Sequence, residues 1–325
     1  MRLPAGLATL LSPLALLALP LALPSCGDGR PATTAGGDPM PARERPRVVC
    51  TTAMVGDVVR AVAGDAIDAV VLIGPGVDPH LWTPTRTEVL EILESDAVFL
   101  SGLMLEGRAG DAFARVEQSG RPVVRIAETI PSSELIADPQ HTAYRDPHVW
   151  MDPVLWAQTA PAVADALARI APASRDAFAA AATRFAADAA ALDAEIARAA
   201  STVPVQRRML VTAHDAFGYF GRRYGLEVRG IQGLSTESEP SLARIEQLVD
   251  ELCTRGVPAV FPETTVGDRG VRALIEGCAA RGHEVRLGDA LFSDSLGRPS
   301  LPEGTWAGML RHNARTVVEA LGGRW

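Results

Sequence analysis

From Arg47 onward, short apolar runs alternate with segments that have the spacing of amphipathic helices. Apolar runs typical of buried strands lie at residues 47–51, 67–73, 97–101 and 122–126. Segments with helical spacing lie between them, at residues 56–62, 88–93 and 110–116, and Thr85 and Glu88 form a capping-box pattern before the second one. Because strands that alternate with helices are joined by crossovers, the pattern predicts a parallel sheet flanked by helices.

A second set of strands and helices follows the first. Its apolar runs lie at residues 209–212, 226–230, 257–261 and 284–287. Residues 241–253 form an amphipathic helix pattern, and another helical stretch at 306–321 ends the chain. The fold class expected is therefore α/β, with two lobes that each contain a four-stranded, mainly parallel sheet.

The two sets are separated by an Ala-rich segment, residues 174–200, that contains neither Gly nor Pro. Phe178, Phe185 and Leu192 recur every seven residues within it. A helix of this length spans about 40 Å at 1.5 Å per residue, and it would join the lobes rigidly; the alternative is a helix packed within one larger domain. We expect a first lobe at 47–172, a linking helix at 173–202 and a second lobe at 203–325.

The N-terminus resembles an export signal. Arg2 precedes a long apolar run interrupted by prolines, and the segment ends at Ser25 and Cys26. The ending resembles a bacterial lipobox, in which the cysteine is lipidated, although Pro24 departs from the usual small residue. We expect a signal peptide at 1–25, then a lipid-anchor cysteine and flexible tether at 26–46; an ordinary secreted protein is the alternative.

Length and charge narrow the function classes. The 325 residues suffice for about two domains, and 47% of them are hydrophobic, which excludes a disordered chain. Asp and Glu outnumber Lys and Arg, 39 to 31. Because no basic stripe is visible, we expect no nucleic-acid partner.

A five-residue motif occurs twice: Asp-Pro-His-Leu-Trp at 78–82 and Asp-Pro-His-Val-Trp at 146–150. Proline restricts the preceding residue to extended backbone, so each histidine is presented from a stiff turn, and the tryptophan can cover one side of it. Both motifs follow predicted strands, at the sheet edge where open α/β sheets bind ligands. A lone histidine is more often structural, but the duplication favours a functional pair, His80 and His148.

The second lobe offers matching groups at strand ends, His214 and Asp294. Taken singly, His214 might cap a helix and Asp294 might be a turn residue. Three histidines and one carboxylate at one sheet edge can provide a four-coordinate site for a divalent metal ion. We therefore expect His80, His148, His214 and Asp294 to bind one metal ion between the lobes.

Nearly the whole chain after the tether resembles the zinc/manganese solute-binding proteins of bacterial ABC importers. The resemblance rests on residues 51–106, 146–153, 214–217, 235–239 and 292–294. It implies two α/β lobes bridged by one helix, a metal ion in the cleft held by the four residues above, and delivery of that ion to a membrane permease. Met104 stands where many relatives have His, and the His-rich loop of dedicated zinc importers is absent, since residues 131–145 contain only His141.

The identity of the metal ion stays open between Zn²⁺ and Mn²⁺. Imidazole ligands suit zinc, whereas carboxylate and water suit manganese. His214 stands where relatives tuned to manganese often have Glu, and this favours zinc. The Ser-Thr-Glu-Ser-Glu segment at 235–239 resembles members that carry manganese as well.

The sequence supports a functional role for several other residues less strongly. Glu263, Asp78 and Asp146 either hydrogen-bond a ligating histidine or only shape the backbone. His283 and His312 are expected to be structural or on the surface, as is His141. Glu237 and Glu239 are expected in a solvated turn, with permease docking as the alternative. Cys253 and Cys278 flank the strand at 257–261, and the sequence does not decide whether they form a disulfide. Cys50 is expected to be buried.

The hypothesis is thus an extracytoplasmic, lipid-anchored, monomeric receptor for a divalent metal ion, with no catalytic residues. One alternative is a secreted zinc hydrolase. The chain contains neither the HExxH nor the GxSxG motif typical of hydrolases, and this disfavours that alternative. The second alternative is a metal-binding surface adhesin, a role in cell adhesion that the sequence does not exclude.

Overall fold

The computed structural model of this chain describes residues 45–138 and 141–325. The expected signal peptide, Cys26 and nearly all of the expected tether lie outside the described residues. Short 3-10 turns occur at Gly64–Ala66, Gly107–Ala109, Ile126–Thr129, Val149–Met151, Pro172–Ser174, Val205–Arg207 and Pro302–Gly304.

The first lobe is built on a four-stranded parallel sheet in the order β2-β1-β3-β4. Its strands are β1 (Arg47–Cys50), β2 (Asp68–Val71), β3 (Ala97–Leu100) and β4 (Val123–Arg125). Alternate side chains of one strand face different layers: Val48 packs in one hydrophobic cluster with Met54, and Val49 packs in another with Ile92. The sheet is therefore covered on both faces, as the apolar runs predict.

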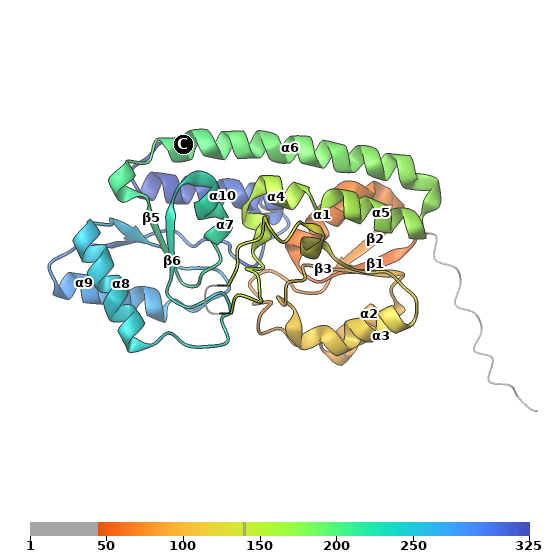
Figure 1. The fold of residues 1–325 in the computed structure, drawn as a ribbon, viewed down its shortest axis with the longest axis horizontal. Helices are drawn as coiled ribbons and strands as arrows, with labels where there is room; N and C mark the ends of the chain where they lie inside the picture. Colours follow the sequence, from red (N-terminus) through yellow and green to blue (C-terminus); the bar gives the residue numbers. More distant parts are fainter. Residues whose placement is uncertain (1–44, 139–140) are drawn as a thin grey trace, which may run out of the picture. The chain divides into compact units, whose positions relative to one another are not determined.

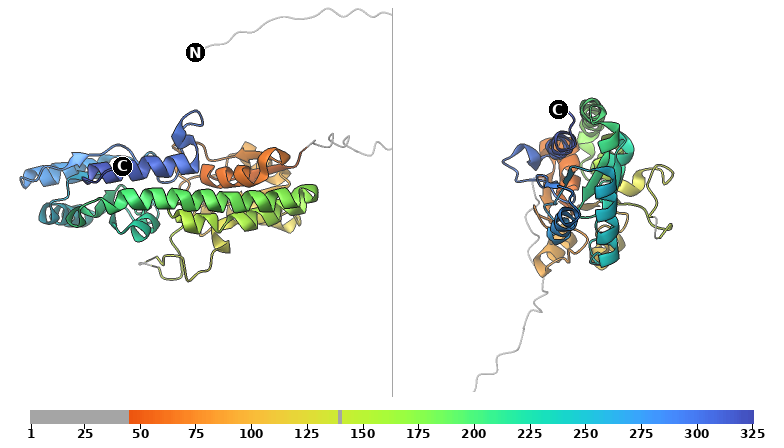
Figure 2. Two further views of the ribbon diagram at one scale, coloured as in Figure 1. Left: turned by 90° about the horizontal axis from the view of Figure 1, so that it is seen from above. Right: turned by 90° about the vertical axis from the view of Figure 1, so that its left-hand side faces the viewer.

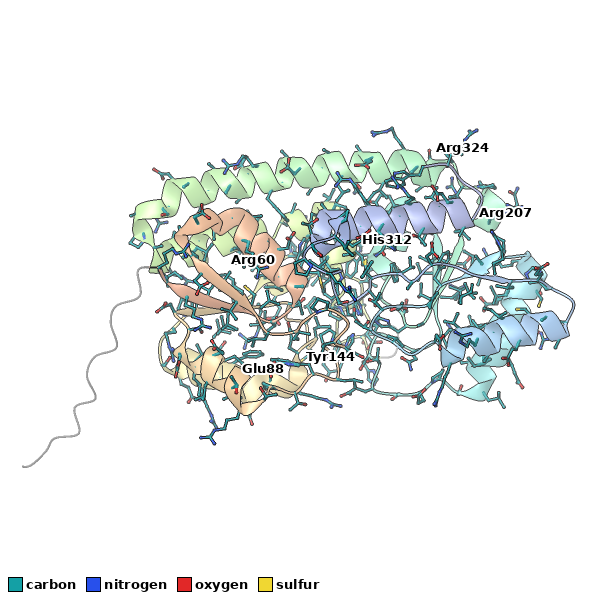
Figure 3. The ribbon with its side chains drawn as sticks, turned by 180° about the vertical axis from the view of Figure 1, so that it is seen from behind. Arg60, Glu88, Tyr144, Arg207, His312 and Arg324 are labelled. Atoms are coloured by element: carbon teal, nitrogen blue, oxygen red, sulfur yellow. The ribbon has the colours of Figure 1, made fainter. Side chains whose placement is uncertain are left out.

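Helices cover the two faces of this sheet (Figure 1). On one face lie α1 (Ala53–Ala63) and α5 (Ala160–Ile170), and on the other lie α2 (Arg86–Glu94) and α3 (Gly110–Gln118). The capping box expected before α2 is present: the Thr85 hydroxyl accepts from Glu88 N–H, and the Glu88 carboxylate accepts from Thr85 N–H. Figure 3 labels Glu88 on this helix.

The four-stranded sheet expected in the second lobe is instead divided into two two-stranded sheets, because its last two strands are only two residues long. Its strands are β5 (Met209–Thr212), β6 (Glu227–Gly230), β7 (Ala259–Val260) and β8 (Arg286–Leu287). They form two parallel pairs, β5-β6 and β7-β8, that are joined by a single parallel bridge between Thr212 and Phe261. The strand expected at 257–261 is reduced to two residues because Pro258 and Pro262, which lack an N–H, bracket it.

The helices of the second lobe surround these strands (Figure 1). They are α7 (Gly218–Tyr224), α8 (Leu242–Arg255), α9 (Arg269–Ala280) and α10 (Trp306–Ala320). Cys253 and Cys278, on α8 and α9, are free thiols, so the structure contains no disulfide between them, and Cys50 is buried as expected.

One helix, α6 (Arg175–Ser201), runs along both lobes (Figure 2). It contacts α1, α5 and the short helix α4 (Pro153–Ala157) in the first lobe, and α7 and α10 in the second. Helix α10 adds a second link between the lobes. The ring of Trp306 packs on Phe185 of α6, with centroids 5.4 Å apart, and the backbone N–H of Trp306 donates to the Asp57 carboxylate of α1. The lobes are thus joined more firmly than a single connecting helix would join them.

The buried face of α6 supplies a stability test. Leu192 is buried in the cluster that spans both lobes. We expect Leu192→Ala to lower the free energy of unfolding by about 2–5 kcal/mol, because the substitution leaves a cavity. Arg184→Ala, at an exposed position of the same helix, should change it by less than about 0.5 kcal/mol. Urea denaturation of the metal-free chain measures both, and equal effects would contradict this packing.

Candidate metal centre

The structure brings His80, His148, His214 and Asp294 together. One potential ligand atom of each lies within 4.8 Å of those of the others, and all four residues are buried. They come from segments far apart in the sequence, two in each lobe. All four residues expected from the sequence therefore meet in one place.

Parallel strands explain why these side chains meet. His80 follows β2, His148 lies in the long segment after β4, and His214 comes directly after β5. Asp294 follows β8, just beyond Leu291, whose backbone bridges to Glu263. Because the carboxyl ends of parallel strands share one edge of a sheet, the two lobes present their strand ends to each other.

The repeated motif forms the same turn in both places. The Asp78 carboxylate accepts from the backbone N–H of His80 at 2.8 Å, and the Asp146 carboxylate accepts from that of His148 at 2.9 Å. An aspartate that accepts from the residue two positions later stabilises a turn in this way. The two aspartates differ in their remaining contacts: Asp146 also bonds the Nδ1 of His148 at 2.7 Å.

Two of the three imidazoles are oriented by carboxylates. In addition to the His148–Asp146 pair, His214 Nδ1 lies 2.5 Å from Glu263 Oε2, and Glu263 Oε1 accepts from the His214 backbone N–H at 2.8 Å. A carboxylate on Nδ1 leaves the Nε2 lone pair to face a metal ion. Of the two possibilities that the sequence left for Glu263, the hydrogen-bonding partner is thus the one observed.

The distances between the ligand atoms fit tetrahedral coordination of a metal ion. His148 Nε2 lies 3.2 Å from His80 Nε2 and 3.3 Å from His214 Nε2. The Asp294 oxygens lie 3.7, 3.4 and 3.1 Å from Nε2 of His80, His148 and His214. Metal–nitrogen bonds of about 2.0–2.1 Å imply edges of about 3.3 Å in a tetrahedron. The observed distances are close to this value.

The negative charge of the Asp294 carboxylate is only partly balanced by the groups around it. Both of its carboxylate oxygens are buried, and neither has a hydrogen bond of good geometry within the described part of the chain. Burial acts to raise its pKa, but the neighbouring His214, His148 and His80 outweigh burial and hold the pKa far below its ordinary value. A buried, ionised carboxylate is costly unless a cation compensates it, and a divalent ion among the three imidazoles would do so.

The histidines differ in their proton affinity. Burial lowers the pKa of His80 to about 3, against the opposing effect of Asp294. Burial also acts to lower the pKa of His214, but Glu263 and Asp294 outweigh it and raise the pKa well above its ordinary value. Without a bound ion, His214 therefore holds a proton more strongly than His80 does.

The two tryptophans of the repeat behave differently. Trp150 packs edge-on against the ring of His148, with centroids 5.3 Å apart, and its indole N–H donates to the Ser293 carbonyl at 2.8 Å. Trp82 packs instead with Ile73 and Ile92 in a separate cluster of the first lobe. A tryptophan thus packs against the histidine of its own motif, as expected, only in the motif at 146–150.

The remaining histidines lie outside the cluster. His283 and His312 each contact a backbone carbonyl, those of Val257 and Ala290, as expected of structural residues; Figure 3 labels His312 on α10. His141 is exposed and lies 3.5 Å from Asp138. It lines a cavity that also reaches His80, although it is not among the four clustered residues.

The sequence did not reveal the role of Glu106. This buried carboxylate accepts from the Thr51 hydroxyl at 2.6 Å and from the Ser101 and Gly102 backbone N–H groups at 2.8 and 3.2 Å. It thereby ties together the ends of β1 and β3. A single Glu in a sequence is normally expected on the surface. The only hint in the sequence was that Glu106 ends the stretch 51–106, which carries the family resemblance.

The profile of the family described as "Zinc-uptake complex component A periplasmic" (ZnuA) matches residues 48–320. This chain belongs to that family. It is 41% identical over 277 residues to the zinc-binding protein TroA of Treponema pallidum, with 85% of this chain and 89% of that protein covered. It is 36% identical over 275 residues to the manganese-binding lipoprotein MntA of Bacillus subtilis, with 85% and 89% covered.

Solved structures of ZnuA-family relatives have the same fold. The structure of the periplasmic zinc-binding protein TroA from Treponema pallidum superposes with a TM-score of 0.82 and covers 85% of this chain and 99% of that one. Fe(III)-bound YtgA from Chlamydia trachomatis superposes with a TM-score of 0.77 at 27% identity, covering 86% and 99%. The two-lobed α/β fold with a long connecting helix is thus confirmed. Among the residues that the structure describes, no helix has the length and apolar composition of a membrane span.

The proton on His214 supplies a test of the site's electrostatics. In the metal-free chain at pH 7, ¹⁵N ring shifts should show His214 with both ring protons and His80 neutral, because their pKa values are shifted in opposite directions. Glu263→Gln should lower the pKa of His214, since burial is then opposed only by Asp294. A neutral His214 in the unaltered chain would contradict the raised pKa of this ring.

Proposed function

We propose that this protein is an extracytoplasmic receptor that captures a divalent transition-metal ion between its lobes and delivers it to the membrane permease of an ABC importer. The single observation that carries the proposal is the convergence of three imidazole nitrogens and a buried carboxylate at distances that suit tetrahedral coordination. Membership of the zinc-uptake family supports it.

We propose His80, His148, His214 and Asp294 as the ligands of the ion. Asp146 and Glu263 orient two of the imidazoles and increase their basicity. Capture needs the proton on His214 to leave, because only a neutral imidazole binds a metal ion.

Zn²⁺ is the ion that this ligand set favours. Imidazole nitrogens suit zinc, and for a site of nitrogen and oxygen ligands the affinity for zinc normally exceeds that for manganese. Relatives carry the names of zinc-binding and manganese-binding proteins, so Mn²⁺ is the alternative cargo.

The role proposed is transport rather than catalysis. A catalytic zinc site keeps a coordination position for water, whereas here four protein groups surround the centre. The ion enters and leaves unchanged, and no bond of a substrate is made or broken.

We also propose the arrangement of the whole chain. Residues 1–25 are an export signal, Cys26 carries the lipid anchor, and residues 26–46 are the tether. The first lobe spans 47–172, the linking helix 173–202 and the second lobe 203–325, and the protein acts as a monomer at the outer face of the cytoplasmic membrane. The naming of MntA as a lipoprotein supports the anchor.

The ligand set can be tested by isothermal titration calorimetry with Zn²⁺ and Mn²⁺. We expect Zn²⁺ to bind at least about 100-fold more tightly than Mn²⁺, and His148→Ala to weaken Zn²⁺ binding by a similar factor or more, because it removes one ligand of four. His283→Ala serves as the control and should bind normally, because its ring contacts the Val257 carbonyl at the amino end of β7. Unaltered binding by the His148 variant would refute the proposed site.

The pH dependence of binding follows from the raised pKa of His214. The proton and the metal ion compete for this ring, so affinity should rise as the pH rises toward that pKa, and it should fall as the pH drops from about 7 to about 5. Titrations in buffers of different ionisation enthalpy at pH 7 should show about one proton released per ion bound. A constant affinity over this range, without proton release, would count against the histidine ligands.

A further inference from the structure

The three imidazoles are not held equally. Nδ1 of His148 bonds Asp146, and Nδ1 of His214 bonds Glu263. Within residues 45–138 and 141–325, Nδ1 of His80 has no such carboxylate partner, and the ring contacts only other members of the cluster, His148, His214 and Asp294. The position of His80 therefore depends on the backbone turn that presents it.

That turn is fastened to the other lobe by one contact. Asp78 Oδ1 accepts from the His80 backbone N–H at 2.8 Å, while its second oxygen, Oδ2, accepts from the Thr236 hydroxyl at 2.5 Å. Thr236 lies in the loop between β6 and α8 of the second lobe. Apart from the ligand cluster, this is the one hydrogen bond in the described part of the chain that joins residues 74–82 to residues 203–325.

The turn that carries His148 is fastened to the second lobe differently. The Tyr219 hydroxyl donates to the Asp146 carbonyl at 2.8 Å, and the Trp150 indole donates to the Ser293 carbonyl at 2.8 Å. Both bonds are buried. His148 is thus fixed to the lobe that also carries His214 and Asp294, although it belongs to the first half of the chain.

The contact between Asp78 and Thr236 lies near the opening of the cleft. A cavity of about 470 Å³ there is lined by His80, Arg108 and Glu237, among others. The Arg108 guanidinium and the Glu237 carboxylate also form an ion pair between the lobes, at 2.7 Å, but their side chains are 47% and 51% exposed. An ion pair so exposed contributes little to holding the lobes together.

We propose that Thr236 is a positioning residue for His80: its hydroxyl, through Asp78, holds the His80 turn against the second lobe and so slows the departure of the bound ion. When this hydrogen bond opens, His80 withdraws with its own turn, and the ion remains on the three ligands anchored to the second lobe. The inference rests on the proposed function, since it concerns the ion held at that site.

The test measures how fast Zn²⁺ leaves the protein. The chain is loaded with Zn²⁺ and mixed with excess chelator in a stopped-flow instrument. Thr236→Val keeps the shape of the side chain and removes the hydroxyl, and we expect it to raise the dissociation rate about tenfold. Thr236→Ala should do the same, so the result does not depend on one variant folding well.

Two control variants separate positioning from general loosening of the cleft. Thr236→Ser retains the hydroxyl and should restore a dissociation rate within about twofold of the original. Glu237→Gln removes the exposed ion pair beside Thr236 and should also change the rate by less than about twofold. The proposal is overturned if Thr236→Val leaves the rate unchanged, if Thr236→Ser is as fast as Thr236→Val, or if Glu237→Gln is as fast as either.

The outcome also distinguishes this inference from the proposed function. If the unaltered chain fails to bind Zn²⁺ and Mn²⁺, the proposed function fails, and the inference fails with it. If the unaltered chain binds Zn²⁺ through His148 and Thr236→Val dissociates at the original rate, the receptor assignment stands and only the role of Thr236 is wrong.

Discussion

The cleft depends on one electrostatic constraint. A buried carboxylate, Asp294, faces three imidazole rings at 3.1–3.7 Å, and a charge in such a place is stable only with a compensating cation. In the metal-free protein a proton on His214 supplies part of that compensation, since Glu263 and Asp294 outweigh burial there and raise its pKa. The protein therefore exchanges one kind of positive charge for another when it takes up an ion.

This constraint explains why the carboxylates around the rings matter as much as the rings. Asp146 and Glu263 each bind both the backbone N–H and the Nδ1 of one histidine. Each carboxylate thus sets the position of the main chain and the orientation of the ring at once. Because these contacts involve atoms other than the Nε2 that would bind the ion, they restrict the movement of the two rings and so reduce the reorganisation that binding requires.

The sequence predicted the parts of the site that local patterns encode. Two copies of Asp-Pro-His at predicted strand ends identified His80 and His148, because rare residues at fixed offsets seldom recur by chance. The alternation of strands with helices and the long helix followed from hydrophobic periodicity, whereas the order of the strands within each sheet did not. The contact of Thr236 with Asp78 and the packing of Trp306 on Phe185 could not be foreseen. Both depend on how the lobes face each other, and in the sequence Thr236 belongs to a stretch that resembles a solvated turn.

Helix α6 has a consequence for how loading can be sensed. It packs on both lobes along 27 residues, and α10 reinforces the junction. A stiff support of this kind resists a wide, hinge-like swing of one lobe against the other. If the proposed permease distinguishes loaded from empty protein, it must therefore recognise a local change near the ligand cluster rather than a change in the overall shape.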